Sequence, residues 1–289
     1  MKSLIYYCCL LFALSSCNQP KNELLLAGSG FHKIVKVNPE GKILWEHPLE
    51  KHQECNAVAS LGDGKVLYSF KQGAKAVDSQ HNVLWQYDAP KGTELQSVEL
   101  LPNGNYLLGQ CGNPAKILEF SPENKLVKSI SFDTQISRPH AQFRHVARTP
   151  KGTYVLGLFA RKVILEVSDK GEILNTFPVN AVPFAVEPLA NGNWMVSGGD
   201  RHNMLEIDPE TGREIKQIAD GELSVPFRFV AEIKELSSGN KLICNWGGHS
   251  KGKAKVAQVI LINPENKVIQ SINDWSNLGK ISAIDLVKK

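Results

Sequence analysis

One apolar–turn–apolar pattern is repeated along most of this chain. Five stretches carry a glycine turn between two apolar segments: LGDGKVLYS, LPNGNYLLG, TPKGTYVLG, LANGNWMVS and LSSGNKLIC, around Gly64, Gly104, Gly152, Gly192 and Gly239. A second turn pattern alternates with the first and occurs six times, as in IVKVNPEGKILW (34–45) and VILINPENKVI (259–269). Glycine, asparagine and proline supply the backbone angles that tight turns require. Each repeat therefore predicts two hairpins, which together make four short strands.

The spacing of these repeats selects the architecture. The last apolar residues before the second turn recur at intervals of 40 to 55 residues: Val37, Val77, Phe120, Val167, Ile207 and Ile262. Four-stranded antiparallel units at this spacing are typical of a β-propeller. No segment beyond the first seventeen residues carries a sustained helical period of apolar residues. We therefore predict an all-β propeller built from four-stranded antiparallel blades.

The two ends of the repeat region predict how the ring closes. NELLLAG (22–28) resembles the strand after a glycine turn, but the strand that should precede it is missing. ISAIDLV (281–287) resembles such a preceding strand, for example LQSVELL (95–101). We expect the C-terminal strand to pair with the N-terminal strands as the innermost strand of a composite blade. This pairing removes two free strand edges and gives six blades in total.

The first seventeen residues differ in composition from the rest of the chain. MKSLIYYCCLLFALSSC has a basic residue, Lys2, an apolar segment from Leu4 to Leu14, and small residues before Cys17. Such a segment is typical of a secretory signal and is too short for a stable membrane span. Its end resembles the lipobox of bacterial lipoproteins, which implies cleavage before Cys17 and lipidation of that cysteine. An ordinary cleaved signal with an incidental cysteine is the alternative.

The lipobox resemblance implies a domain organisation and a location. Residues 1–17 are expected to be a lipoprotein signal peptide, 18–22 a polar tether and 23–289 a single β-propeller domain. Two or three acyl chains would anchor the protein stably to a membrane. We expect a monomer in the cell envelope, lipid-anchored to a bacterial membrane on the periplasmic side of the outer membrane or at the cell surface.

Charge and cysteine content exclude several other classes of protein. The 33 basic and 29 acidic residues are spread along the chain without a basic run, so we expect no nucleic-acid binding. Three cysteines follow the signal segment, Cys55, Cys111 and Cys244, and their wide spacing predicts buried thiols. A single Cys55–Cys111 disulfide stays open as an alternative. Because the sequence has no CxxC motif and no cysteine–histidine pair at metal-ligand spacing, we expect no metal site.

The repeats resemble those of quinoprotein-like (PQQ-repeat) propellers over nearly all of residues 23–289. Gly41-Lys42-Ile43-Leu44-Trp45 and Asn82-Val83-Leu84-Trp85 are similar to the end of the tryptophan-docking repeats of that superfamily. The LPNGNYLL type of strand resembles six-bladed arylsulfotransferase-like propellers, and similar lipid-anchored six-bladed proteins occur in gut-type Gram-negative bacteria.

Quinone binding is not expected despite this resemblance. Quinoprotein dehydrogenases have eight blades, a vicinal disulfide over the quinone and a calcium site, whereas the vicinal Cys8-Cys9 pair of this chain lies within the signal segment. Other repeats replace the docking tryptophan by Lys128, Asn175 and Gln270. We therefore expect no cofactor, and we expect Trp45 and Trp85 to pack between neighbouring blades.

The loops of one propeller face are the expected site of function. The loops that lead into the inner strands share this face with the loops between second and third strands, and neither is fixed by blade packing. Two leading loops place an arginine after a proline and a phenylalanine: ISRPHAQFRHV (136–146) with Phe143-Arg144, and LSVPFRFVAEI (223–233) with Phe227-Arg228. A guanidinium beside a ring suits a carboxylate or sulfate, and the ring suits an apolar or sugar face. The alternative is that the phenylalanines plug the channel and the arginines pair with an acid such as Glu232.

Twelve residues of this face are predicted to contact a ligand. They are His140, Phe143, Arg144, His145, Arg161, Phe184, Arg201, His202, Phe227, Arg228, Trp246 and His249. The same loops also hold Glu54, Lys71, Glu94, Asp200 and Phe229.

These features favour a non-catalytic binding protein over an enzyme. We expect a lipid-anchored envelope propeller that binds a glycan fragment, another anionic small molecule or an envelope protein partner on its loop-rich face. The alternative is an enzyme that acts on a sugar or sulfate ester. The arylsulfotransferase-like resemblance implies a histidine nucleophile for it, which would fall on His145 or His140 with Arg144 and Arg228 in support. A pure assembly scaffold is the third hypothesis.

Overall fold

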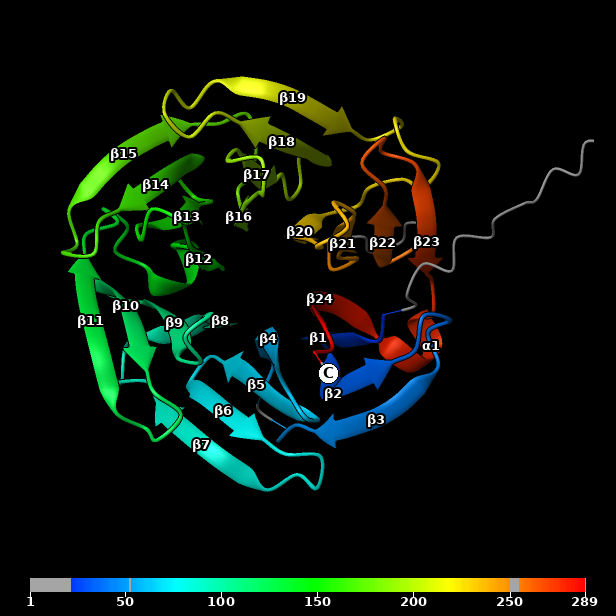
Figure 1. Cartoon of the computed structure of the whole chain (residues 1–289), viewed down its shortest axis with the longest axis horizontal. Coiled ribbons are helices and arrows are strands. Elements are labelled where there is room, and N and C mark those ends of the chain that lie inside the picture. Colours follow the sequence, from blue (N-terminus) through cyan, green and yellow to red (C-terminus); the bar gives the residue numbers. More distant parts are fainter. Residues whose placement is uncertain (1–21, 52, 250–254, 289) are drawn as a thin grey trace, which may run out of the picture.

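Six four-stranded antiparallel sheets form a closed ring around a central axis (Figure 1). The computed structural model describes residues 22–51, 53–249 and 255–288. The prediction of an all-β propeller with six blades is confirmed. Within the described residues, no helix is long and apolar enough to cross a membrane. The expected signal peptide and the lipidation site Cys17 lie outside the described residues.

The blades follow one another along the chain, and the strands of each blade are named from the innermost to the outermost. The first three blades are β24 (Lys280–Leu286), β1 (Leu24–Ser29), β2 (Phe31–Val37) and β3 (Ile43–Pro48); β4 (Cys55–Gly62), β5 (Lys65–Phe70), β6 (Gly73–Val77) and β7 (Val83–Asp88); and β8 (Glu94–Leu100), β9 (Tyr106–Cys111), β10 (Ala115–Phe120) and β11 (Leu126–Phe132). The other three are β12 (Val146–Arg148), β13 (Tyr154–Leu158), β14 (Val163–Val167) and β15 (Ile173–Pro178); β16 (Val186–Pro188), β17 (Trp194–Ser197), β18 (Asn203–Ile207) and β19 (Glu214–Ala219); and β20 (Val230–Glu235), β21 (Lys241–Asn245), β22 (Val259–Ile262) and β23 (Val268–Ile272). A 3-10 turn, η1 (Pro139–Ala141), and a short helix, α1 (Trp275–Leu278), lie in loops that lead into inner strands.

The composite blade closes the ring as the sequence predicts. Strand β24 pairs antiparallel with β1, with Leu24 opposite Leu286 and Leu26 opposite Ile284. Ile284 is fully buried, so the two chain ends share an apolar core as well as a hydrogen-bonded ladder. This pairing leaves neither β1 nor β24 with an open edge on that side.

The outer hairpin of every blade has the same geometry. Its turn contains one residue with a positive φ between 60° and 91°, and these residues are Gly41, His81, Asn124, Gly171, Gly212 and Asn266. Glycine and asparagine tolerate this conformation best. Directly after the turn, each outer strand carries a one-residue register shift against its neighbour. The shared geometry makes positions in different blades directly comparable.

The core lies between neighbouring blades. Trp85 of β7 packs edge-on against Tyr106 and Phe120 of the next blade, with ring centroids 5.3 and 5.5 Å away. Trp45 of β3 donates a hydrogen bond from Nε1 to the carbonyl oxygen of Ser79, 2.9 Å away in the next blade. The two tryptophans therefore join blades, as expected from the sequence.

The three cysteines of the propeller are free and buried. Burial raises the pKa of the Cys111 thiol to about 12, and burial also raises the pKa of Cys55 and Cys244. These thiols are therefore apolar core groups, and the alternative of a Cys55–Cys111 disulfide is wrong.

Candidate functional site

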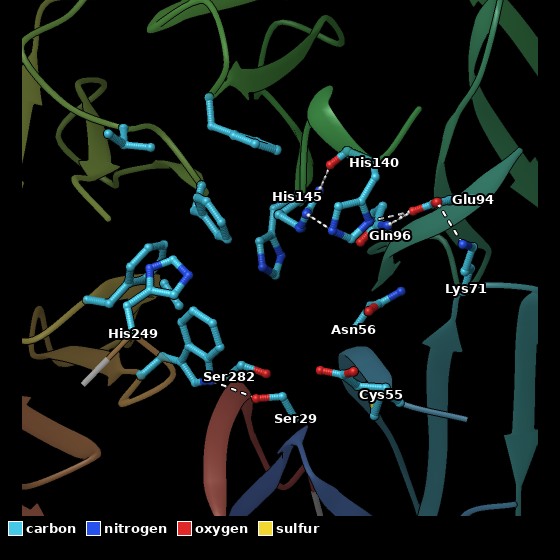
Figure 2. Close-up of a pocket in the computed structure, with 18 of the residues that line it drawn as sticks. Ser29, Cys55, Asn56, Lys71, Glu94, Gln96, His140, His145, His249 and Ser282 are labelled. Atoms are coloured by element: carbon cyan, nitrogen blue, oxygen red, sulfur yellow. Dashed lines mark hydrogen bonds and ion pairs between the residues drawn. The ribbon is translucent and has the colours of Figure 1, made fainter. Parts of the chain in front are cut away.

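A cavity of about 540 Å³ lies on the propeller axis at the face formed by the leading loops and the loops between second and third strands (Figure 2). All six blades contribute to its wall. The lining residues are Ser29, Glu54, Cys55, Asn56, Lys71, Gln72, Glu94, Gln96, His140, Arg144, His145, Phe159, Val182, Phe184, Asp200, Phe229, Ala231, Trp246, His249 and Ser282. Because residues far apart in the sequence converge here, the cavity is a product of ring closure.

Glu94, the first residue of β8, organises one side of the cavity. Its Oε2 accepts hydrogen bonds from His140 Nδ1 at 2.8 Å and from Gln96 Nε2 at 3.0 Å, and its Oε1 lies 3.1 Å from Lys71 Nζ (Figure 2). Burial alone would raise the pKa of Glu94, but the bonds from His140 and Lys71 outweigh burial and hold the pKa below its usual value. The ionised carboxylate therefore fixes three polar side chains at the cavity wall.

Arg144 folds back over the 3-10 turn that precedes it. Its Nη1 donates to the carbonyl oxygens of His140 at 3.0 Å and Phe143 at 3.1 Å, and its Nη2 lies 3.2 Å from Nε2 of His140. Because a guanidinium can only donate, Nε2 of His140 accepts, and the imidazole proton resides on Nδ1, where it faces Glu94. The guanidinium carbon lies 4.7 Å from the ring centre of Phe159 and 5.4 Å from that of Phe184.

Arg144 forms no ion pair among the described residues, although the charges of Glu94 and Glu54 in the same cavity wall act on it from a greater distance. Its hydrogen bonds go to two carbonyl groups and a neutral imidazole, and no described carboxylate forms an ion pair with it. Burial lowers the pKa of Arg144, but a guanidinium stays charged at neutral pH after such a shift. The positive charge of Arg144 is therefore held in place by carbonyl dipoles, a ring nitrogen and aromatic rings.

His145 lies deeper, where the cavity meets the inner strands. Figure 2 shows its ring directed towards the middle of the cavity. Its Nδ1 lies 3.7 Å from Oε1 of Glu232. Burial lowers the pKa of His145 against the pull of Glu232, so the ring is neutral at neutral pH and offers a hydrogen-bonding nitrogen without a charge.

Further along the inner strands, the half-buried Lys234 lies among four carboxylates. Lys234 Nζ lies 3.2 Å from Oε1 of Glu232, and Asp285, Glu187 and Glu99 also raise the pKa of Lys234 against the opposing effect of burial. Burial raises the pKa of Glu99 and that of Glu187 to about 7. The central channel therefore holds a charged network on the side away from the loops.

Aromatic rings form the cavity wall opposite Glu94. Phe229 meets the rings of Phe184, Trp246 and His249 edge-on, with centroids 4.5, 5.2 and 5.4 Å away. Phe159 lies 5.1 Å from Phe184 and extends this wall to Arg144. These rings present a contiguous apolar surface of the kind that binds the apolar face of a ligand.

The loop after β21 is held in place by two hydrogen bonds and one glycine. Trp246 Nε1 donates to Oγ of Ser29 at 2.9 Å, and His249 Nδ1 lies 2.9 Å from Oδ1 of Asp200. A Cβ at Gly248 would overlap the indole of Trp246, so this position requires glycine. The glycine-rich NWGGH stretch therefore allows a ring and the backbone to approach each other closely.

The structure brings half of the predicted ligand residues to the cavity. His140, Arg144, His145, Phe184, Trp246 and His249 line it, whereas Phe143, Arg161, Arg201, His202, Phe227 and Arg228 are not among the lining residues.

Specific contacts explain why these other six lie elsewhere. Phe143 and Phe227 are fully buried in the apolar core between blades, so they neither face a ligand nor plug the channel. Arg161 donates to the carbonyl oxygen of Thr134 at 3.2 Å, and Arg201 is exposed. His202 buries its Nδ1 in the described structure without a hydrogen-bond partner.

The expected convergence of Arg144 and Arg228 is not found. The backbone nitrogen of Arg228 donates to Oδ1 of Asn245 at 2.7 Å, and its Nε is buried without a partner in the described structure. The alternative pairing of these arginines with Glu232 is also not found, because Glu232 pairs with His145 and Lys234.

Fourteen lining residues were not among the predicted ligand residues, and Phe159, Asn56, Gln96 and Glu94 are four of them. Phe159 stands in the same loop as Arg161, and the loop position was the only signal available for it. Asn56 and Gln96 belong to inner strands rather than loops. Within the described residues, no group of three His, Cys, Asp or Glu side chains is arranged to hold a metal ion.

The known structures most informative for this chain share its architecture. A protein of unknown function from Bacteroides caccae is 37% identical, with a TM-score of 0.89 over 93% of this chain and 100% of that chain. Virginiamycin B lyase from Staphylococcus aureus is 11% identical, with a TM-score of 0.60 over 90% of this chain and 87% of that one. A propeller chain in a nidogen/laminin complex is 12% identical, with a TM-score of 0.64 over 92% of this chain and 98% of that one. The last two likenesses show the fold alone.

Sequence comparison identifies the family. None of the curated proteins compared matches this sequence. The family described as Mal s 1 allergenic protein-like matches residues 30–266, which include strands of all six blades. The chain therefore belongs to the Mal s 1 allergenic protein-like family.

Proposed function

We propose that this protein is a non-catalytic binding protein of the cell envelope whose axial cavity takes a small glycan fragment or another small molecule that carries a carboxylate or sulfate. The observation that carries the proposal is the guanidinium of Arg144, which forms no ion pair in the described structure and stands between the aromatic wall and the polar wall of one cavity. The volume of about 540 Å³ is in the usual range for small-ligand pockets.

The anionic group of the ligand is assigned to Arg144. An arginine that stacks on two rings keeps its plane fixed, and a planar guanidinium binds carboxylate and sulfate groups through parallel hydrogen bonds. Lys71 is a weaker candidate for this role because Glu94 already holds its ammonium group 3.1 Å away. His145 lies deeper in the cavity. Because it is neutral, it can contact the ligand without adding a second positive charge near Arg144.

The remainder of the ligand is assigned to the aromatic wall. Trp246 is partly exposed. Phe184 and Trp246 both pack against Phe229, so their rings belong to one apolar surface. A sugar ring has an apolar face for such a surface and hydroxyl groups for polar partners such as Asn56 and Gln96 on the other side.

The histidines support binding better than catalysis. Both nitrogens of His140 are engaged, Nδ1 by Glu94 and Nε2 by Arg144, so neither is available as a nucleophile in this arrangement. His145 is the group on which the alternative, an enzyme acting on a sugar or sulfate ester, depends. A binding role predicts that a bound ester is recovered intact, and release of sulfate or sugar would favour the enzyme.

Lipid anchoring through Cys17 is part of the same proposal. The support is the lipobox-like sequence before Cys17 and the short tether to the propeller, because β1 begins at Leu24. A tether of five residues spans at most about 18 Å, so an anchored propeller would stay close to the membrane.

A screen of glycan fragments and small anions against the protein tests the proposal, with tryptophan fluorescence as the first readout because Trp246 lines the cavity. For any ligand found, Arg144→Ala should weaken binding by about 1.5–3 kcal/mol, the scale of a charged hydrogen bond. Arg201→Ala is the matched control, since Arg201 belongs to the same face but does not line the cavity. Equal losses in both variants, or none in either, would refute the assignment to this cavity.

A further inference from the structure

Two histidines from neighbouring blades meet outside the axial cavity. Nδ1 of His47, in β3, lies 3.1 Å from Nδ1 of His81, in the turn between β6 and β7. His47 is 8% exposed, whereas His81 is exposed to solvent. Each imidazole therefore turns the same ring nitrogen towards the other, and solvent reaches the pair from the side of His81.

Comparison of the six blades shows that both histidines depart from the repeat. The position of His47 in the outer strand is otherwise apolar, with Tyr87, Ile130, Phe177, Ile218 and Ile272 in the other blades. The positive-φ position of His81 is otherwise glycine or asparagine, with Gly41, Asn124, Gly171, Gly212 and Asn266.

The positive-φ turn position of one blade contacts the outer-strand position of the neighbouring blade, as two other interfaces show. A Cβ at Gly41 would lie 3.3 Å from the side chain of Ile272, and a Cβ at Gly171 would lie 3.3 Å from that of Ile130. Of the six described interfaces between blades, the one between the first and second blades is the only one with a histidine at both positions. His81 has a φ of 69°, in the left-handed region that histidine adopts more readily than most other non-glycine residues.

The surroundings hold both rings in place. The indole of Trp45 stacks on His81 at 5.6 Å and on His47 at 6.0 Å between ring centroids. Tyr68 places its hydroxyl oxygen 3.4 Å from Nε2 of His47, so this oxygen can accept the Nε2–H proton and leave Nδ1 without one. Burial lowers the pKa of His47, and the charges of His81 and Lys75 lower it further. In the same turn as His81, a side-chain hydrogen bond from Asn82 lowers the pKa of Asp78, and the charge of His81 lowers it further.

We propose that His47 and His81 form a bidentate site for a first-row divalent transition ion, Cu²⁺ or Zn²⁺, which would link the first and second blades. Two metal–nitrogen bonds of 2.0–2.1 Å to atoms 3.1 Å apart enclose an angle of about 98°, which suits both ions. Imidazole is a preferred ligand of both, and water would complete the coordination on the exposed side of His81. The site lies apart from the axial cavity and does not depend on what that cavity binds.

Trp45 gives a direct readout of this site. Cu²⁺ within a few ångströms of the indole quenches its fluorescence, so titration of the untagged protein with Cu²⁺ should show saturable quenching at one equivalent. Zn²⁺ does not quench but should compete for the site. At about a hundredfold excess over the dissociation constant, Zn²⁺ should raise Tm by about 3–8 °C because it binds the folded protein only.

The repeats supply the test variants. His81→Asn introduces the residue that stands at positions 124 and 266, and His47→Ile introduces the residue of positions 130, 218 and 272. Each should keep the fold, weaken Cu²⁺ binding at least about tenfold and abolish the effect of Zn²⁺ on Tm. His32→Asn, which removes an exposed histidine of the first blade, should change neither result.

Three results would overturn the proposal. The first is the absence of saturable Cu²⁺ binding by the wild-type protein at micromolar concentration, which would mean that the two rings only share a proton. The second is unchanged affinity in His81→Asn, which would place the metal elsewhere. The third is an equal loss in His32→Asn, which would indicate nonspecific binding to histidines. Ligand binding in the axial cavity is unaffected by all three results.

Discussion

Nη2 of Arg144 lies 3.2 Å from Nε2 of His140, and this contact decides which nitrogen of the imidazole carries the proton. The proton must stay on Nδ1, where it binds Glu94 at 2.8 Å. Glutamate, histidine and arginine therefore form one ordered chain along the cavity wall, and the positive charge stands at its end.

Substitution of Arg144 by lysine should break this chain without removing the charge. We expect Arg144→Lys to weaken the binding of an anionic ligand by about 1–2 kcal/mol. An ammonium group cannot stack on Phe159 or form two parallel hydrogen bonds with a carboxylate or sulfate. The Nδ1–H tautomer of His140 should lose its dominance, which imidazole ¹⁵N chemical shifts measure. A dominant Nε2–H tautomer in the wild-type protein would contradict the proposed chain.

The carboxyl groups of Glu99 and Glu187 should make stability fall as pH rises. Burial raises both pKa values from 4.5 to about 7, so between these values the folded protein keeps protons that the unfolded chain has lost. The free energy of unfolding should therefore decrease from about pH 4.5 to pH 7, by about 1–3 kcal/mol for each group.

Urea unfolding at pH 5 and pH 8 measures this effect. Glu99→Gln and Glu187→Gln should each reduce the difference between the two pH values, since an amide does not titrate. Glu172→Gln, at an exposed position, is the control. A wild-type protein that is more stable at pH 8 than at pH 5, with no change in the glutamine variants, would show that these groups do not dominate.

The composite blade should depend strongly on its C-terminal strand. Deletion of residues 281–289 removes most of β24 and exposes the edge of β1, so we expect aggregation or a large loss of stability. Ile284→Ala is a milder test: Ile284 is fully buried, and its truncation should cost about 2–4 kcal/mol. Melting of the truncated protein within one or two degrees of the intact protein would disprove the structural role of this strand.

Membrane attachment should depend on Cys17 alone among the cysteines of the signal segment. Cys17→Ser should either release the protein from the membrane fraction or leave it as an unprocessed precursor, whereas Cys8→Ser in the same segment should behave as the wild type. Fractionation and immunoblotting measure both outcomes. A Cys17→Ser protein that is processed and still membrane-bound would refute the lipobox interpretation.

The fold was predictable because each blade encodes it locally. The turn residues recur with every hairpin, and the composite blade followed from one strand pattern that was missing at one end and present at the other. Whether the side chain of a loop residue faces the core or the cavity was not predictable in this way. Phe143 and Arg144 are neighbours in sequence, yet the phenylalanine enters the core and the arginine enters the cavity. Such loops lack the alternation that assigns strand residues to a face.

Side-chain contacts between blades could not be predicted from the sequence for a related reason. His47 and His81 are 34 residues apart in the sequence, and the distance between their rings depends on how two sheets pack. Arg228 shows the reverse case, because its loop resembles that of Arg144 in sequence but is held by Asn245 in another position. Similar local sequence therefore predicted similar strands, but it did not predict similar side-chain surroundings.

The pairing of β1 with β24 gives this protein an order of assembly. Chains emerge from the ribosome with the N-terminus first, so among the described strands β1 is made first and its inner partner β24 is made after all the others. Until then β1 can form only the hairpin with β2, and its other edge stays available to any extended segment nearby. The propeller therefore cannot close before β24 has been made, and a chain interrupted before that point would expose an unpaired strand edge that proteases and chaperones can recognise.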